Sequence, residues 1–213
     1  MRLIIGLGSG RCGTTSLADL LSYQEDCRVT HEYSPVPWVF DKKAWDWATW
    51  RILSRLTPYD RKVTGEVGFY WLPYVERWLE IKSDTKFICL WRDRKEVMDS
   101  MWEFSRGLNV DPKDEWYRLY PYYPGVNNHE AIGLMWDDYD KISRMWKEKY
   151  PDKFMIIEMN KALNDEYHQR KMLEFAGFDN PRVRLGITLN TNEKPVGGDD
   201  LGRERTETIC LAE

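Results

Sequence analysis

Residues 3–17 read LIIGLGSGRCGTTSL, and this stretch decides the fold. An apolar run typical of a buried strand leads into three closely spaced glycines, and a helical sequence begins at Thr14. Glycine permits positive φ and lets a ligand approach the backbone, while the first N–H groups of a helix have no partner inside it. This order of strand, glycine turn and helix start predicts a cradle for an anion, above all a phosphate.

Two general nucleotide-binding interpretations compete for this loop. Gly8, Gly10 and Gly13 fit the G-x-G-x-x-G spacing of a dinucleotide site. Glu32 follows about twenty residues later, where such a site has an acid for the ribose. Gly8 and Gly13 also frame a G-x-x-x-x-G loop, but Thr14 stands where an NTPase needs a lysine. The absence of a lysine at position 14 argues against ATP or GTP hydrolysis.

A third interpretation rests on a family resemblance. The loop core Arg11-x-Gly13-Thr14-Thr15 resembles the 5′-phosphosulfate loop of the sulfotransferases, which carry lysine or arginine at the Arg11 position. Residues 86–100, KFICLWRDRKEVMDS, look like the 3′-phosphate segment of that family, with a buried strand ending near Arg92 and Ser100 on the following helix. Looser matches at 153–158 and 173–178 extend the similarity to about residues 1–180.

The hydrophobic pattern predicts an α/β protein. Short apolar runs at 2–7, 27–31, 62–65, 85–91 and 153–158 alternate with helical stretches, two of which run from about Asp41 to Leu56 and from about His129 to Tyr150. We expect a three-layer fold with a parallel sheet flanked by helices, of the P-loop-containing, sulfotransferase-like type that the resemblance implies. Residues 1–213 are interpreted as one such domain.

Two segments fall outside this pattern. Residues 106–128 form an aromatic-rich stretch interrupted by prolines, interpreted either as a lid or acceptor loop or as a cluster packed on the body. Residues 190–213 are interpreted as a polar tail.

The resemblance also implies a donor and a binding site. The donor substrate would be 3′-phosphoadenosine 5′-phosphosulfate (PAPS), the product 3′-phosphoadenosine 5′-phosphate (PAP), and no metal would be required. Arg92 and Ser100 would hold the 3′-phosphate, and the glycine loop would hold the 5′ end. The expected binding residues are Ser9, Gly10, Arg11, Cys12, Gly13, Thr14, Thr15, Ser16, Arg92 and Ser100.

Four residues are candidates for catalysis. Arg11 would neutralise the leaving phosphate, and Glu32 is the preferred base because several carbohydrate sulfotransferases carry a glutamate soon after the second strand. His31 is the second choice, and strand alternation allows only one of the pair to face the site if the strand runs through both. Glu66 follows the third strand, where the family often has a polar residue. Ligands of open α/β sheets bind beyond the carboxyl ends of the strands, where all these elements end.

This chain also departs from the sulfotransferase pattern. Ser16 stands where cytosolic sulfotransferases have a tryptophan, and their C-terminal Arg-Lys-Gly segment has no obvious equivalent. The alternatives therefore stay open at this point: a Rossmann-type dinucleotide-binding oxidoreductase, or a non-catalytic nucleotide- or glycan-binding module of the same fold. The acceptor is expected to be a small molecule or carbohydrate, and its identity and the oligomeric state are not specified by the sequence.

Composition limits the functional classes. Hydrophobic residues make up 42% of the chain and the net charge is −4, so no overall basic field favours nucleic acid. No apolar run approaches the roughly eighteen residues of a membrane span, and Met1 leads directly into the first strand without a signal-peptide pattern. We therefore expect a cytoplasmic protein with reduced thiols. Cys12 is interpreted as a small filler of the loop, although neighbouring helical N–H groups are of the kind that lower a thiol pKa.

Overall fold

A computed structural model of the chain describes residues 2–56, 61–106 and 119–187. Its elements, in chain order, are β1 (Arg2–Gly8), α1 (Thr14–Ser22), β2 (Cys27–His31), α2 (Lys42–Leu56), β3 (Val63–Val67), the 3-10 helix η2 (Phe69–Tyr74), α3 (Val75–Ile81), β4 (Lys86–Trp91), α4 (Arg94–Arg106), α6 (Asn128–Lys149), β5 (Phe154–Glu158), α7 (Met159–Asn164) and α8 (Glu166–Ala176).

The five strands form one parallel sheet in the order β2-β3-β1-β4-β5. Each strand falls on one of the predicted apolar runs, with ends that differ by at most two residues. The predicted α/β fold with a parallel sheet and flanking helices is therefore confirmed. Because β1 lies between β3 and β4, the glycine loop that follows it lies at the centre of the sheet edge.

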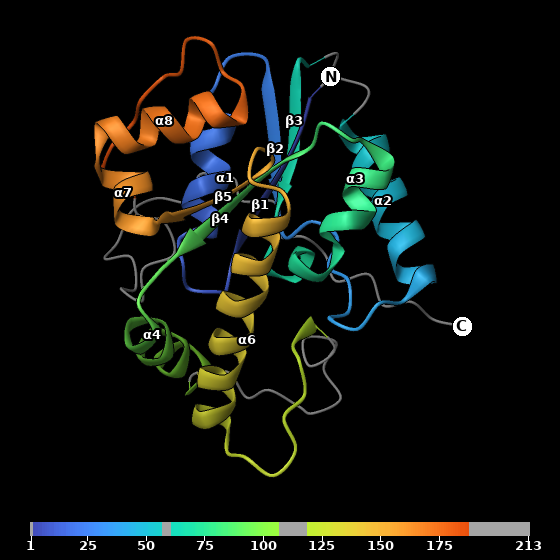
Figure 1. Ribbon diagram of the computed structural model, residues 1–213, viewed down its shortest axis with the longest axis vertical. Coiled ribbons are helices and arrows are strands. Elements are labelled where there is room, and N and C mark those ends of the chain that lie inside the picture. Colours follow the sequence, from blue (N-terminus) through green and yellow to red (C-terminus); the bar gives the residue numbers. More distant parts are fainter. Residues whose placement is uncertain (1, 57–60, 107–118, 188–213) are drawn as a thin grey trace, which may run out of the picture.

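Helices cover both faces of the sheet, as expected for parallel strands. Along β1, Leu3, Ile5 and Leu7 join the core on one face, whereas Ile4 joins the core on the other. Helices α2, α3 and α6 pack over the first face, and α1, α7 and α8 over the second (Figure 1). Buried side chains on both faces of the central strand explain why residues 3–7 read as a nearly continuous apolar run.

Many of the aromatic residues lie in the core rather than on a surface. The rings of Trp45, Trp71 and Trp78 meet edge to face, with centroids 5.2 Å apart for Trp45–Trp78 and for Trp71–Trp78. In contrast, the side chain of Trp47 on α2 is 49% exposed and that of Trp50 is 65% exposed. The first face of the sheet, under α2, α3 and α6, is thus filled mainly by large rings, and α2 carries aromatic residues on its outer side as well.

The aromatic-rich segment 106–128 is described only in part, because residues 107–118 lie outside the described residues. At its end, Leu119 is buried, and Tyr120 stacks on Phe69 with ring centroids 4.5 Å apart. This end of the segment therefore packs on the body of the protein. The predicted tail, residues 190–213, lies wholly outside the described residues.

Gly65 in β3 gives a test of the packing around the central strand. A Cβ at this position would clash with the backbone oxygen of Ile4, which cannot move without disturbing the sheet. We expect Gly65→Ala to lower the free energy of unfolding by about 3 kcal/mol, measured by urea denaturation. As a control, Gly125→Ala meets no atom within 4 Å and has only its positive φ of 81° to cost stability, about 1 kcal/mol. Equal losses in the two variants would contradict this account.

Candidate active site

The turn between β1 and α1 consists largely of left-handed backbone. Gly10, Arg11 and Gly13 have φ values of 86°, 52° and 76°. A Cβ added to Gly10 would lie 2.7 Å from the Cε atom of Met101, so this position is both left-handed and crowded. Gly13 occupies the N-cap position of α1 and offers no capping side chain. The loop therefore ends at a helix N-terminus of the kind that binds phosphate groups.

Buried polar contacts fix this loop to the core. The N–H of Gly8 donates to the hydroxyl of Tyr139 on α6 at 2.9 Å, and this hydroxyl donates to the carbonyl of Phe69 at 3.2 Å. Ser9 Oγ and Cys12 Sγ lie 3.1 Å apart, and both residues are buried. Helical N–H groups are of the kind that lower a thiol pKa, but burial dominates here and raises the pKa of Cys12, in keeping with its interpretation as a small filler of the loop. Cys12 thus lies in the loop as a buried, protonated thiol.

The second phosphate segment reaches the same loop. Arg92 follows β4, and its Nη1 donates to the carbonyl oxygen of Arg11 at 2.8 Å, while its Nε pairs with Glu96 at 2.9 Å. On α4, the hydroxyl of Ser100 accepts from Arg11 Nε at 3.1 Å. The structure therefore brings Arg11, Arg92 and Ser100 together, although some eighty residues of chain separate the two segments.

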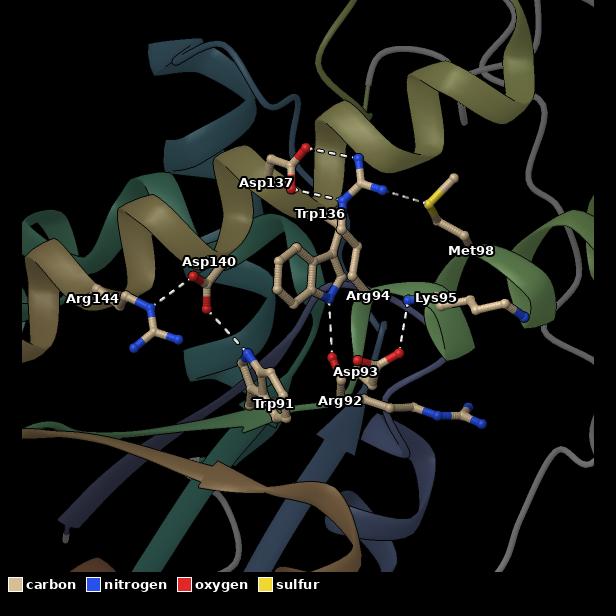
Figure 2. Close-up of polar contacts among 10 residues, drawn as sticks. All are labelled: Trp91, Arg92, Asp93, Arg94, Lys95, Met98, Trp136, Asp137, Asp140 and Arg144. Carbon is tan, nitrogen blue, oxygen red and sulfur yellow. Dashed lines mark hydrogen bonds and ion pairs between the residues drawn. The ribbon is translucent and has the colours of Figure 1, made fainter.

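Helix α6 holds the backbone of the second segment in place (Figure 2). The indole N–H of Trp136 donates to the carbonyl of Arg92 at 3.0 Å, and Arg94 makes two hydrogen bonds of 2.8 Å to the carboxylate of Asp137. The start of α4 is thus attached to α6 on both sides of Asp93. Arg92 is therefore positioned by the sheet, by α4 and by α6 together.

The electrostatics of this corner favour an anion. Burial, and to a smaller extent the charge of Arg92, lower the pKa of Arg11, and the Arg92 side chain donates to the Arg11 carbonyl. The guanidinium carbon of Arg11 also lies 4.9 Å from the centroid of the Phe104 ring. The ion pair with Glu96 offsets part of the repulsion that Arg92 exerts on Arg11, and a further anion would offset the rest. A phosphate bound here would remove that repulsion.

The end of β2 brings a third group of polar side chains to the loop. His31 Nε2 lies 3.1 Å from the Thr14 hydroxyl and 3.5 Å from the Thr15 hydroxyl, both on the first turn of α1. The strand ends at His31, and Glu32 adopts a left-handed φ of 47°. The alternation rule therefore does not apply across this pair, and His31 Nε2 and Glu32 Oε1 are only 4.0 Å apart.

Burial shifts the pKa values of this pair in opposite directions. It lowers the pKa of His31 to about 4 and raises the pKa of Glu32 to about 7. At neutral pH the imidazole is therefore uncharged, and the carboxyl group is close to half-protonated. A carboxyl group of this kind has the proton affinity that general-base chemistry near pH 7 requires.

Glu66 differs from the other catalytic candidates because it is fully buried and its two carboxylate oxygens already have partners. One oxygen accepts from the Thr30 hydroxyl, and the other accepts from the backbone N–H of Tyr33 at 2.7 Å and from the Tyr70 hydroxyl at 3.4 Å. Desolvation raises the pKa of Glu66 to about 7. Since it bonds residues on either side of His31 and Glu32, Glu66 has the geometry of a residue that positions their turn.

The remaining predicted loop residue, Ser16, is buried on α1. Within the described ranges, no cluster of three His, Cys, Asp or Glu side chains is arranged to hold a metal ion. No helix in the same ranges is long and apolar enough to cross a membrane.

Comparison with solved structures identifies the fold. The sulfotransferase domain from the curacin biosynthetic pathway superposes with a TM-score of 0.55 at 12% identity, over 82% of this chain and 73% of that domain. A sulfotransferase from Alicyclobacillus acidocaldarius superposes with a TM-score of 0.55 at 17% identity, over 88% of this chain and 87% of the bacterial chain. Mouse sulfotransferase SULT7A1 complexed with PAP superposes with a TM-score of 0.53 at 16% identity, over 84% of this chain and 60% of the mouse protein.

These neighbours show that the chain has the fold of the sulfotransferases. By sequence, no protein-family model matches the chain, and no curated protein matches it either. The likeness therefore lies in the three-dimensional arrangement of the chain.

Strand order separates this fold from the dinucleotide-binding alternative. In a Rossmann sheet the second strand lies beside the first, so that the acid at its end faces the glycine loop. Here β3 lies between β1 and β2, and Glu32 is two strands away from β1. The glycine spacing and Glu32 therefore do not combine into a dinucleotide site.

Glu66→Gln tests the buried carboxyl group, because glutamine is able to keep the same contacts. Its oxygen accepts from Tyr33 and its amide nitrogen donates to Thr30. The pKa of Glu66 is raised from 4.5 to about 7, so its stabilising contribution is present below about pH 4.5 and is lost as the pH rises through about 7. Relative to the variant, the wild-type free energy of unfolding should fall by about 3 kcal/mol between pH 4.5 and pH 8.

Urea denaturation of both proteins across this pH range measures the difference, and the opposite contribution of His31 cancels because both proteins contain it. Glu76→Gln serves as a control of opposite sign, because hydrogen bonds from Lys149 and Tyr150 lower the pKa of the exposed Glu76. Parallel pH profiles for wild type and Glu66→Gln would contradict the assignment.

Proposed function

We propose that this chain is a sulfotransferase that transfers a sulfuryl group from PAPS to a hydroxyl or amine of a small-molecule or carbohydrate acceptor. The observation that supports it best is the meeting of Arg11, Arg92 and Ser100 at a helix N-terminus, beside His31 and Glu32. A ligand with two separate phosphate groups fits this arrangement. The fold shared with a sulfotransferase complexed with PAP supports the same donor.

The donor would lie across the ends of β1 and β4. The left-handed loop and the start of α1 would hold the 5′-phosphosulfate through backbone N–H groups and the hydroxyls of Thr14 and Thr15. Arg92 and Ser100 would hold the 3′-phosphate, which distinguishes PAPS from ordinary adenine nucleotides. Arg11 belongs to the loop and contacts Ser100, so its charge serves the region between the two phosphates.

The transfer itself is an in-line displacement at sulfur. The acceptor oxygen or nitrogen forms a bond to sulfur, the bond from sulfur to the 5′-phosphate oxygen breaks, and PAP leaves with the additional negative charge. Glu32 takes the proton from the acceptor as general base, and Arg11 stabilises the charge that develops on the leaving phosphate. His31 lies between the loop hydroxyls and Glu32, and its Nε2 is within hydrogen-bond distance of the Thr14 hydroxyl.

Nucleotide binding tests the proposed 3′-phosphate site. We expect Arg92→Ala to weaken PAP binding by about 10- to 100-fold, because a charge-assisted contact is lost. Ser100→Ala, which removes only a neutral hydroxyl, should weaken it by about 5-fold. Binding of AMP, which lacks the 3′-phosphate, should change little in either variant. Calorimetry of PAP and AMP with all three proteins gives the comparison, and a folded wild type that does not bind PAP would remove the proposal.

The pH dependence of turnover tests the base. Because a general base must be unprotonated, kcat/KM should rise with pH through about 7, the raised pKa of Glu32. We expect Glu32→Gln to lower kcat/KM by about 10²- to 10⁴-fold and to abolish this rise, with PAP affinity unchanged. A rise centred near pH 4 would instead identify His31 as the base. Full activity of Glu32→Gln in a sulfate-transfer assay would show that the assigned role is wrong.

A further inference from the structure

An arginine on the outer side of α2 lies against two aromatic rings next to the candidate base. The guanidinium carbon of Arg51 is 4.4 Å from the ring centroid of Tyr33 and 4.8 Å from that of Trp47. Trp47 and Arg51 are one helical turn apart, and Tyr33 follows Glu32 directly in the chain. Cation–π contacts with both rings hold the guanidinium in one place and leave its in-plane N–H donors to bind another group.

Two other arginines of this chain lie against an aromatic ring and also form an ion pair with a carboxylate. Arg77 lies over the Phe40 ring at 4.8 Å and also pairs with Glu80 at 3.0 Å. Arg184 lies 5.4 Å from the Tyr23 ring centroid and pairs with Asp19 at 2.8 Å. In both cases an aromatic ring contacts the guanidinium and a carboxylate accepts from its N–H groups.

Arg51 contacts two aromatic rings but, within the described part of the chain, forms no ion pair with a carboxylate. Among the residues that the structure describes, no carboxylate forms an ion pair with Arg51, and no oxygen accepts a hydrogen bond from it. Asp46, one turn earlier on the same helix, pairs with Lys42 instead. The guanidinium is thus oriented by aromatic rings, and its N–H donors have no acceptor from these parts of the protein.

The position of Arg51 relates it to the acceptor side of the site. The backbone N–H of Tyr33 donates to the carboxylate of the buried Glu66 at 2.7 Å. This bond holds the backbone of the residue whose ring Arg51 contacts. The Cα atoms of Glu32 and Tyr33 are about 3.8 Å apart, as in any trans peptide. Arg51 therefore lies, from α2, against the residue that directly follows the candidate base, whereas Arg92 reaches the loop from the end of β4.

We propose that Arg51 binds an oxyanion group of the acceptor, a carboxylate or a phosphate or sulfate ester, while the half-exposed ring of Trp47 packs against the acceptor skeleton. This inference rests on the proposed sulfotransferase function. The planar guanidinium presents paired N–H donors that match the paired oxygens of such groups. The acceptor class is then an anionic molecule that carries a second hydroxyl or amine for the transfer.

Binding of small probes to the full chain saturated with PAP tests this inference. The probes are 4-hydroxyphenylacetate, phenyl phosphate and the neutral 4-hydroxyphenylacetamide, titrated by NMR. We expect both anions to bind at least tenfold more tightly than the amide. Arg51→Gln should reduce their affinity to the level of the amide without changing the affinity for PAP. Arg51→Lys should recover part of the loss, because it restores the charge without the planar donors.

Arg77→Gln is the matched control, because it also removes an arginine from an aromatic ring, and it should leave binding of the probes unchanged. Equal affinity for the amide and the anions, or anion binding that survives Arg51→Gln, would overturn the inference. So would a loss of PAP affinity in Arg51→Gln, since Arg51 would then belong to the donor site. A preference between carboxylate and phosphate identifies the anionic group.

The outcomes also separate this inference from the proposed function. If PAP binds and the anions do not, the acceptor assignment fails and the sulfotransferase proposal stands. If the anions bind through Arg51 in a protein that does not bind PAP, the sulfotransferase proposal fails, and with it the claim that this anion is an acceptor.

Discussion

The hydrogen bond from the Arg92 side chain to the Arg11 carbonyl is the interaction on which the candidate site depends. It joins the loop after β1 to the segment after β4, and it forms because these strands are neighbours whose carboxyl ends meet at the same edge. Tyr139 and Trp136 attach both segments to α6, by way of the Gly8 N–H and the Arg92 carbonyl. The spacing between the loop and the segment that carries Arg92 is therefore set by the width of one strand pair and by one helix.

The sequence allowed the fold and the two phosphate segments to be predicted because their signals are local. The apolar run, the glycines and the Thr14-Thr15 pair are adjacent in the chain, and Arg92 and Ser100 lie on one strand–helix unit. Their convergence then follows from the parallel sheet. The catalytic and binding roles given to these residues remain predictions, since the fold alone is shared with the solved sulfotransferases.

The contacts that local pattern did not predict come from distant parts of the chain. Tyr139 lies within the helix predicted from about His129 to Tyr150, and nothing in the neighbouring sequence indicated its bond to Gly8. The left-handed Glu32 carries no glycine-like or asparagine-like signal in the sequence, and the buried Glu66 bonds Thr30 and Tyr33 on either side of it. Such features depend on tertiary packing, so they become visible only when the strands are placed side by side.

The strand order also places the two groups of candidate site residues at different positions in the sheet, one beside its central strands and one at its border. The contacts among Arg11, Arg92 and Ser100 arise beside β1 and β4, which neighbouring strands enclose. His31 ends β2, the outermost strand on that side of the order, and Glu32 follows it. Substitutions along this border and on α2 change the surroundings of Glu32 and Tyr33 without altering the central pair of strands. Variation at this margin of the sheet therefore leaves the contacts among Arg11, Arg92 and Ser100 in place.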